Sequence, residues 1–154
     1  MAEKMRWRYG ETNPVIGFVQ STVGIEIGDL VFRDNDNVRP AGSQANQTTK
    51  ALNQSIFASN FLGVAMQSSP VGEASSIRIA TTGTFEFDCN PSTFILGNIV
   101  GVDELPGRVG LENQKVDTVT AIAGAIGRVA KREPAQTKSV MVNIKSTVME
   151  GGIK

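Results

Sequence analysis

Histidine is absent from the 154 residues of the sequence, and cysteine, tryptophan and tyrosine each occur once. Without histidine, neither a Ser-His-Asp nor a Cys-His nucleophile system can be built, and imidazole metal sites are excluded. One cysteine can form neither an internal disulfide nor a thiolate zinc site. An enzyme made from this chain would have to use carboxylates, lysines or hydroxyls. The composition therefore points away from catalysis, and we expect no catalytic residue, no cofactor and no metal.

The chain also lacks an excess of charge of either sign and any long apolar run. Lys and Arg number 15, Asp and Glu number 15, and the formal net charge is zero. This balance argues against a strongly basic nucleic-acid binder and against an acidic disordered tail. No apolar run approaches the roughly 18–20 residues of a membrane span, and the amino terminus does not have the pattern of a secretory signal. The length predicts one domain with its own core.

Residues 1–14 are predicted to form an N-terminal arm. Within it, basic and apolar side chains alternate: Lys4, Met5, Arg6, Trp7, Arg8 and Tyr9. Such alternation predicts an extended segment with one basic and one apolar edge. Trp, Tyr and Arg are the residues most enriched at interface hot spots. Two interpretations stay open: the aromatic side chains fold back on their own domain, or they contact another subunit.

Residues 15–154 are predicted to form a single small β-barrel or sandwich of short antiparallel strands. Apolar or alternating runs separated by glycine-bearing turns predict strands over 15–20, 23–27, 30–32, 62–66, 76–81, 84–89, 99–102, 125–130 and 139–148. Many short strands with such turns indicate a mainly β barrel or sandwich. A Thr82-Gly83 turn predicts that the runs 76–81 and 84–89 form a hairpin.

A long loop and one short helix interrupt this β pattern at about 33–60. Residues 33–47 are polar and rich in turn-forming residues, so they are predicted to form a loop. Thr48 or Thr49 can cap a helix whose small and apolar residues follow helical spacing, and Asn60 can end it. A helix of about three turns is marginal by itself and must pack on something.

Three groups of polar residues suggest chemistry at first sight. The run 34–37, DNDN, lacks the EF-hand spacing because Arg39 stands where a glycine is required, so it is interpreted as a solvated turn. Glu86 and Asp88 share one face of a predicted strand and could form a glycosidase-like carboxylate pair. Phenylalanines on the opposite face favour a simpler interpretation, a strand with one solvated face. Cys89 is predicted to be a small buried apolar residue.

A set of short motifs occurs in a characteristic order along the chain. These are Gly28-Asp29-Leu30-Val31-Phe32, Phe61-Leu62-Gly63-Val64-Ala65, Ile77-Arg78-Ile79-Ala80 with Gly83-Thr84-Phe85-Glu86-Phe87, Gly97-Asn98-Ile99-Val100-Gly101-Val102, Ala125-Ile126-Gly127-Arg128-Val129 and Val140-Met141-Val142-Asn143-Ile144. From about residue 15 to the C-terminus, their order and spacing resemble the small β-barrel decoration, or cement, proteins of tailed-bacteriophage capsids. The arm lies outside the matched region.

The resemblance implies a structural virion protein made in the host cytoplasm and located on the outer capsid surface. Such proteins typically sit as trimers at three-fold positions, bind after the shell expands and clamp adjoining subunits. The implied partners are the major capsid protein and further copies of the chain, with no membrane, specific nucleic acid or small-molecule substrate. We predict that four arm residues contact the capsid or a neighbouring protomer: Arg6, Trp7, Arg8 and Tyr9.

Three alternatives remain at this point. A tail or neck protein built on a small barrel would differ only in its place in the virion. A nucleic-acid-binding barrel would use the aromatic and basic residues of the arm for stacking and phosphate contact. An enzyme would have to rely on Glu86 or Asp88.

Overall fold

The computed structural model describes residues 4–107 and 109–149 and is built mainly of β-strands. The strands are β1 (Trp7–Tyr9), β2 (Val15–Val19), β3 (Leu30–Asp34), β4 (Asn37–Pro40), β5 (Phe61–Ala65), β6 (Ser75–Ala80), β7 (Thr82–Phe94), β8 (Ile99–Glu104), β9 (Leu111–Thr118), β10 (Gly127–Val129) and β11 (Glu133–Lys145). The helix α1 (Lys50–Ser59) and the 3-10 turns η1 (Ala41–Ser43), η2 (Ile122–Gly124) and η3 (Thr147–Met149) complete the described elements. The predicted mainly β fold with one short helix is confirmed.

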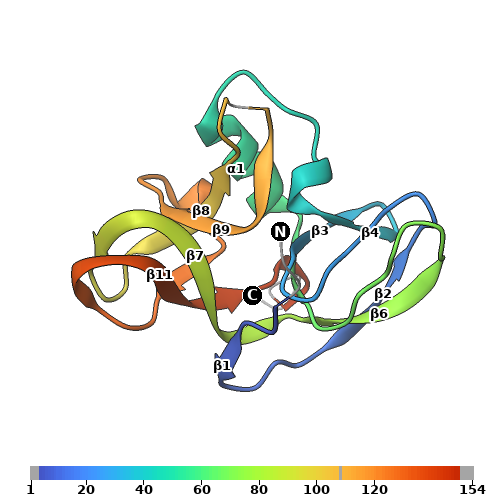
Figure 1. Cartoon of the computed structure of the whole chain (residues 1–154), viewed down its shortest axis with the longest axis horizontal. Coiled ribbons are helices and arrows are strands. Elements are labelled where there is room, and N and C mark those ends of the chain that lie inside the picture. Colours follow the sequence, from blue (N-terminus) through green and yellow to red (C-terminus); the bar gives the residue numbers. More distant parts are fainter. Residues whose placement is uncertain (1–3, 108, 150–154) are drawn as a thin grey trace.

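The strands close into two small barrels that follow one another along the chain (Figure 1). The first has the order β2-β4-β3-β5-β6 and is a closed ring. In the second, the order is β7-β11-β10-β8-β9, and a parallel pairing of β9 with β7 closes the ring. Strand β1 adds to the outer side of β7. Closure leaves few exposed strand edges in either ring, which protects such sheets from edge-to-edge association.

The two barrels share a hydrophobic core. One cluster of buried side chains fills the second barrel and continues into the first through Leu30, Phe61 and Val64. A smaller cluster, which includes Val19, Val31 and Ile79, fills the first barrel. Apolar residues alternate with polar ones along the strands, and this alternation creates the clusters because successive side chains point to opposite faces of a sheet.

Helix α1 covers one side of this shared core and lies above β8 and β9 in Figure 1. Thr49 begins it by accepting a hydrogen bond on its Oγ1 from the Leu52 N–H at 3.1 Å, and Asn60 ends it. Phe57 is fully buried, with ring centroids 5.8 Å from Phe32 and 5.7 Å from Phe61. The predicted helix, its cap and its need for a packing surface are confirmed.

The predicted hairpin between 76–81 and 84–89 is wrong. Strands β6 and β7 do not pair, because β6 completes the first barrel and β7 begins the second. Thr81, between them, is buried and donates its backbone N–H to the Thr12 carbonyl and its hydroxyl to the Asn13 carbonyl. Gly83 has a φ of +114°, which accommodates the change of direction. The local turn signal therefore marks a crossover between barrels.

Three further strand predictions need correction. The predicted loop 33–47 contains β4, which pairs with β3 in a hairpin that turns at Asn35. The predicted strand 23–27 is reduced to one isolated bridge, between Ile25 and Ser69. Strand β9 was not predicted, because its buried positions include the polar residues Glu112 and Gln114.

The arm is not detached from the rest of the chain, since its residues 7–9 form β1. Residues 1–3 of the predicted arm and 150–154 of the predicted barrel domain lie outside the described residues. The division of the chain at residue 14 stays a prediction. In the described part of the chain, no helix combines the length and apolar character required to span a bilayer.

Replacing Phe57 by alanine should lower the free energy of unfolding by about 3–5 kcal/mol, because the cavity would open in the shared core. Leu52 lies on the same helix and is 41% exposed. Its replacement by alanine should change the free energy by no more than about 0.5 kcal/mol. Urea denaturation of both variants measures the difference. Equal effects would show that α1 does not pack on the core as described.

Candidate functional site

The arm lies across both barrels and is held mainly by backbone hydrogen bonds. In the second barrel, β1 pairs with β7 in the register Trp7↔Phe85 and Tyr9↔Thr84. The Glu86 N–H donates to the Arg6 carbonyl at 2.9 Å. Toward the first barrel, the Lys4 N–H donates to the Ile27 carbonyl at 2.9 Å. The arm therefore connects the two barrels from outside.

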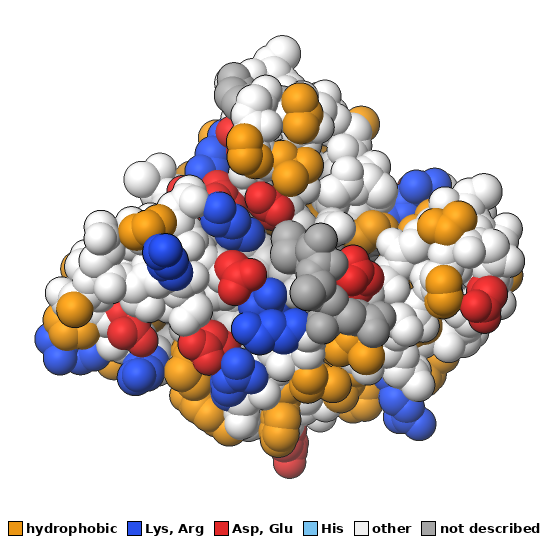
Figure 2. Space-filling model, in the orientation of Figure 1, with side chains coloured by type: hydrophobic (Ala, Val, Ile, Leu, Met, Phe, Trp, Pro, Cys, Tyr) orange, Lys and Arg blue, Asp and Glu red, His pale blue; other side chains and the backbone are white. Residues whose placement is uncertain are grey.

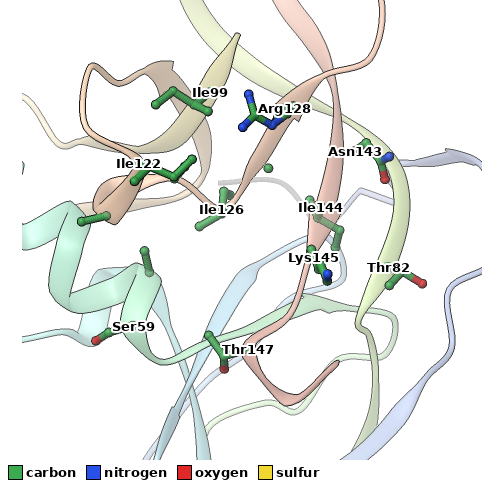
Figure 3. Close-up of a pocket in the computed structure, with 14 residues that line it drawn as sticks. Ser59, Thr82, Ile99, Ile122, Ile126, Arg128, Asn143, Ile144, Lys145 and Thr147 are labelled. Atoms are coloured by element: carbon green, nitrogen blue, oxygen red, sulfur yellow. The ribbon is translucent and has the colours of Figure 1, made fainter. Parts of the chain in front are cut away.

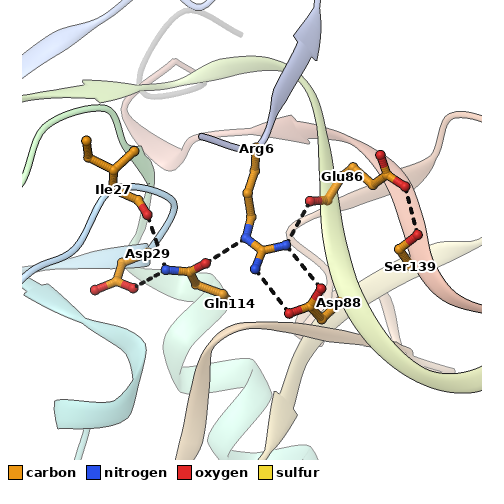
Figure 4. Close-up of polar contacts among 7 residues, drawn as sticks. All are labelled: Arg6, Ile27, Asp29, Glu86, Asp88, Gln114 and Ser139. Carbon is orange, nitrogen blue, oxygen red and sulfur yellow. Dashed lines mark hydrogen bonds and ion pairs between the residues drawn. The ribbon is translucent and has the colours of Figure 1, made fainter. Parts of the chain in front are cut away.

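Arg6 is the residue by which the arm is anchored. Its side chain is only 3% exposed, and three groups surround its guanidinium (Figure 4). Nε donates to Gln114 Oε1 at 2.7 Å, Nη2 pairs with Asp88 Oδ2 at 3.1 Å, and Nη1 donates to the Glu86 carbonyl at 3.1 Å. Hydrogen bonds that involve a charged partner are the stronger ones in proteins. This set fixes the arm against β7 and β9.

Gln114 extends the anchor into the first barrel. Its amide nitrogen donates to Asp29 Oδ1 at 2.9 Å and to the Ile27 carbonyl at 3.2 Å. Burial raises the pKa of the Asp29 carboxyl, against hydrogen bonds from the Glu26 N–H and from Gln114 that favour its charged form. We call Arg6, Asp29, Asp88 and Gln114 the arm clamp. It joins the arm to both barrels through polar contacts that are buried at Gln114 and Asp29 and partly exposed at Asp88.

Arg8 binds the same strand nearer the surface. Its Nε pairs with Glu86 Oε1 at 2.9 Å, and Glu86 Oε2 accepts a hydrogen bond from the Ser139 hydroxyl at 2.7 Å. The Ser139 hydrogen bond and the charge of Arg8 lower the pKa of the Glu86 carboxyl. Glu86 and Asp88, the carboxylate pair noted in the sequence, therefore each face an arginine of the arm.

The apolar edge of the arm points away from the protein. Met5 is 50% exposed, Trp7 43% and Tyr9 51%, and we call these three side chains the arm ridge. The indole N–H of Trp7 donates to the Gly10 carbonyl at 2.9 Å, which fixes the orientation of the ring. Hydrophobic side chains gather along the lower margin of the molecule, over β1 (Figure 2). The arm thus buries Arg6 from its charged edge and leaves its apolar edge exposed.

Gly28 allows the arm to lie this close to the first barrel. Its φ is +97°, a conformation that favours glycine, and a Cβ built there would collide with the Lys4 carbonyl oxygen. The turn predicted at Gly28-Asp29 is present, and its glycine also provides space for the arm.

A groove opens on the other side of β7 from the arm (Figure 3). Its volume is about 730 Å³, within the range of roughly 300–1,000 Å³ that is usual for binding pockets. The end of α1 and the turn η2 form one wall, and β10 with the end of β11 forms the other. The apolar lining includes Ile99, Ile122, Ile126 and Ile144. Ile122 is 66% exposed, so the groove presents apolar surface to its surroundings.

Cationic side chains border this groove. Arg128 of β10 and Lys145 of β11 are part of its lining, together with Asn143, and no carboxylate is among the described lining residues. Arg128 and Asn143 are register partners, so they lie side by side on the outer face of the sheet. The groove therefore combines a mixed polar and apolar lining, in which Ile122 is the large exposed apolar side chain, with a positive border.

The described residues show neither a metal-ligand cluster nor an activated cysteine. They contain no cluster of three or more His, Cys, Asp or Glu side chains able to hold a metal ion. Cys89 is 6% exposed, and burial raises the pKa of its thiol to about 11. The thiolate is the reactive form of cysteine, so this residue is poorly suited to nucleophilic chemistry. Its predicted burial is confirmed.

Lys50, the first residue of α1, pairs with two acidic residues of the second barrel. Lys50 Nζ lies 2.9 Å from Asp103 Oδ1 and 2.8 Å from Asp117 Oδ2, which connects the helix to β8 and β9. Burial disfavours the charged amine, but the two carboxylates outweigh it and raise the pKa of Lys50. This cluster is structural.

The four arm residues singled out in the sequence take two different positions. Trp7, Arg8 and Tyr9 are accessible, and their role as contacts stays a prediction. Arg6 makes its contacts inside the chain, so its side chain supports the contact surface from beneath. The sequence analysis missed Gln114 and the groove. A single buried polar residue does not change the sequence pattern of a strand. A groove between segments that are distant in the sequence has no local sequence signal.

Comparisons with known proteins add little. No family model matches the sequence, and no curated protein matches it. A solved structure, the head fiber gp8.5 N base of bacteriophage phi29, is similar over 86% of this chain and 94% of that chain. Its sequence identity is 11% and its TM-score is 0.47. At this level of likeness, we transfer neither family nor function to the chain.

Replacing Arg6 by methionine should lower the free energy of unfolding by about 2–3 kcal/mol, because Gln114 and Asp88 would lose a charged partner in a mostly buried site. Arg8→Met is the matched control, because Arg8 lies two residues further along the arm and nearer the surface. It should cost no more than about 1 kcal/mol. Urea denaturation measures both. If Arg6→Met cost no more than Arg8→Met, the arm clamp would not anchor the arm.

Cys89 should resist alkylation in the folded protein. Its pKa moves from an ordinary value of 9.0 to about 11, so the thiolate fraction at pH 8 should fall about a hundredfold. Iodoacetamide labelling, followed by mass spectrometry, should be slow in buffer and fast in concentrated urea. Equal rates would contradict the buried position of the thiol.

Proposed function

We propose that this chain is a structural protein of a phage virion that binds the outer surface of the capsid as a trimeric decoration protein. In that role it stabilises the expanded shell against the pressure of packaged DNA. The motifs that resemble decoration proteins support the proposal. They lie on or beside the strands that build both barrels, for example β5 (Phe61–Ala65) and β8 (Ile99–Glu104).

The observation that carries the proposal is the outward orientation of the arm ridge. An apolar edge normally packs inward, yet here the buried side chain is Arg6, while Arg8 pairs with Glu86 nearer the surface. Fully burying a large apolar side chain contributes about 1.5–3 kcal/mol, and the free chain realises only part of this for Met5, Trp7 and Tyr9. Exposed aromatic residues beside arginine are typical of interface hot spots. We infer that another molecule of the virion covers the ridge.

The anchored arm suits this role because it is ordered before binding. Binding costs free energy for each side chain or loop that must be immobilised, and a preorganised surface avoids part of that cost. The arm clamp holds the backbone, and the Trp7 N–H bond to the Gly10 carbonyl holds the indole. A decoration protein gains from this, since each of its contacts can be modest when several act together.

Stabilisation of a shell by a decoration protein follows from linkage. A ligand that binds the expanded lattice more tightly than the precursor shifts the population toward the expanded state. Opening of the lattice would then require loss of the bound protein. No covalent bond needs to be made or broken in this role.

The nucleic-acid alternative is less favoured by the geometry. Phosphate binding by Arg6 or Arg8 would require them to leave Asp88 and Glu86. In these pairs the two carboxylates offset the arginine charge that a phosphate backbone would need. A salt titration of binding to single-stranded DNA separates the alternatives, because phosphate contact gives a steep salt dependence.

The double variant Trp7→Ala/Tyr9→Ala should bind isolated expanded capsids at least about tenfold more weakly than the unmodified chain. The aromatic side chains supply the apolar area of the contact, while the fold does not depend on them. Cosedimentation of protein with capsids measures occupancy. The matched control is Val71→Ala/Ile95→Ala, which removes two side chains that are each 70% exposed elsewhere on the surface.

The control variant should retain full occupancy, and both variants should unfold at the same urea concentration as the parent. Loss of occupancy in both would point to a general effect of surface apolar area. Full occupancy of the arm variant, or no binding of the parent to expanded capsids, would reject the proposed function. Electron microscopy of labelled virions would reveal a tail or neck location instead.

A further inference from the structure

The arm ridge and the groove are complementary surfaces on the same chain. The ridge exposes three large apolar side chains, whereas the groove is concave, with Ile122 exposed at its wall among polar and apolar lining residues. Both remain open in the single chain. Large apolar surfaces that stay exposed generally mark interaction sites.

Their charges are complementary as well. The two arginines of the arm are paired with carboxylates beneath it, so they do not set the charge of the ridge. Glu11 follows the ridge and is exposed; its backbone carbonyl accepts a hydrogen bond from the Thr82 hydroxyl at 2.7 Å, whereas its carboxylate makes no hydrogen bond or ion pair with the residues the structure describes. The groove offers Arg128 and Lys145 on its border and no described carboxylate in its lining. An acidic group beside an apolar ridge fits that border.

The positions of the two surfaces allow one copy to use both at once. Thr84 of β7 pairs with Tyr9 of the arm on one side and with Asn143 of the groove on the other. The ridge and the groove therefore flank β7 and do not obstruct each other. A contact between two different surfaces of identical chains is heterologous, and such contacts close into a ring when the rotation between copies permits.

We propose that the groove receives the arm ridge of a second copy of this chain. Trp7 and Tyr9 of one copy pack against the apolar lining around Ile122 of the next, and Glu11 lies beside Arg128. This inference deepens the proposed function, because it assigns the ridge to contact between protomers. The capsid would then meet the ring as a whole.

Self-association provides a direct test that does not involve capsids. Sedimentation equilibrium of the full chain should reveal an oligomer, and Trp7→Ala/Tyr9→Ala and Ile122→Glu should each weaken association at least about tenfold. Lys138→Glu is the charge control, since Lys138 is exposed on β11 outside the groove. It should associate like the parent. Urea denaturation of each variant checks that the fold is intact.

Two combinations of variants identify the partner surfaces. Glu11→Lys and Arg128→Glu should each weaken association, and the double variant should recover it, because the charges are exchanged across the contact. A mixture of the ridge variant with the groove variant Ile122→Glu should form dimers but no larger rings, since only one intact contact can form. Each result supports a heterologous contact.

Other results would overturn the inference. A parent chain that stays monomeric at all concentrations, or an oligomer that Ile122→Glu leaves unchanged, would exclude the groove as the docking site. The groove would also be excluded if the double variant Glu11→Lys/Arg128→Glu associated more weakly than either single variant, by the sum of their separate effects. Monomers that coat capsids would reject this inference and the trimeric state in the proposed function, and would leave the capsid-binding role standing. Rings that ignore capsids would support the inference and reject the proposed function.

Discussion

The position of the arm depends on the guanidinium of Arg6. It binds Gln114 of the second barrel, whose amide binds Asp29 of the first, and it pairs with Asp88 on β7. A charge buried to 3% exposure requires such partners, because an unpaired buried charge is very costly. Once Arg6 is fixed, the alternation of the arm decides where its neighbours point. Trp7, the next residue, must face away from the protein.

The contacts that hold the arm in place also determine which of its side chains stay exposed. Most amphipathic segments bury their apolar side and leave their charges in water. In this chain, carboxylates on β7 receive the charged side, and the apolar side becomes available to another molecule. Part of the apolar area of Met5, Trp7 and Tyr9 therefore remains exposed in the free chain. The same strand, β7, separates this ridge from an apolar groove with a cationic border, so the two barrels present two distinct surfaces.

The sequence predicted those features that depend on neighbouring residues. Helix α1, with Thr49 at its start and Asn60 at its end, follows from capping and spacing. The alternation of the arm was also visible, but its direction was not, because the partners of Arg6 lie about eighty residues or more away in the chain. Strand β9 was hidden since Gln114 occupies a buried position as a polar residue. The turn at Thr82-Gly83 was misinterpreted because local turn chemistry is the same in a hairpin and in a crossover.

The central claim is that the arm ridge is covered when the protein is in its working assembly. Hydroxyl-radical footprinting compares the oxidation of Trp7 and Tyr9 in the dilute free chain and in the protein bound to expanded capsids. The account predicts strong protection of both aromatic side chains on the capsid, with exposed Val71 unchanged. Equal oxidation of Trp7 and Tyr9 in the free and bound protein would contradict it.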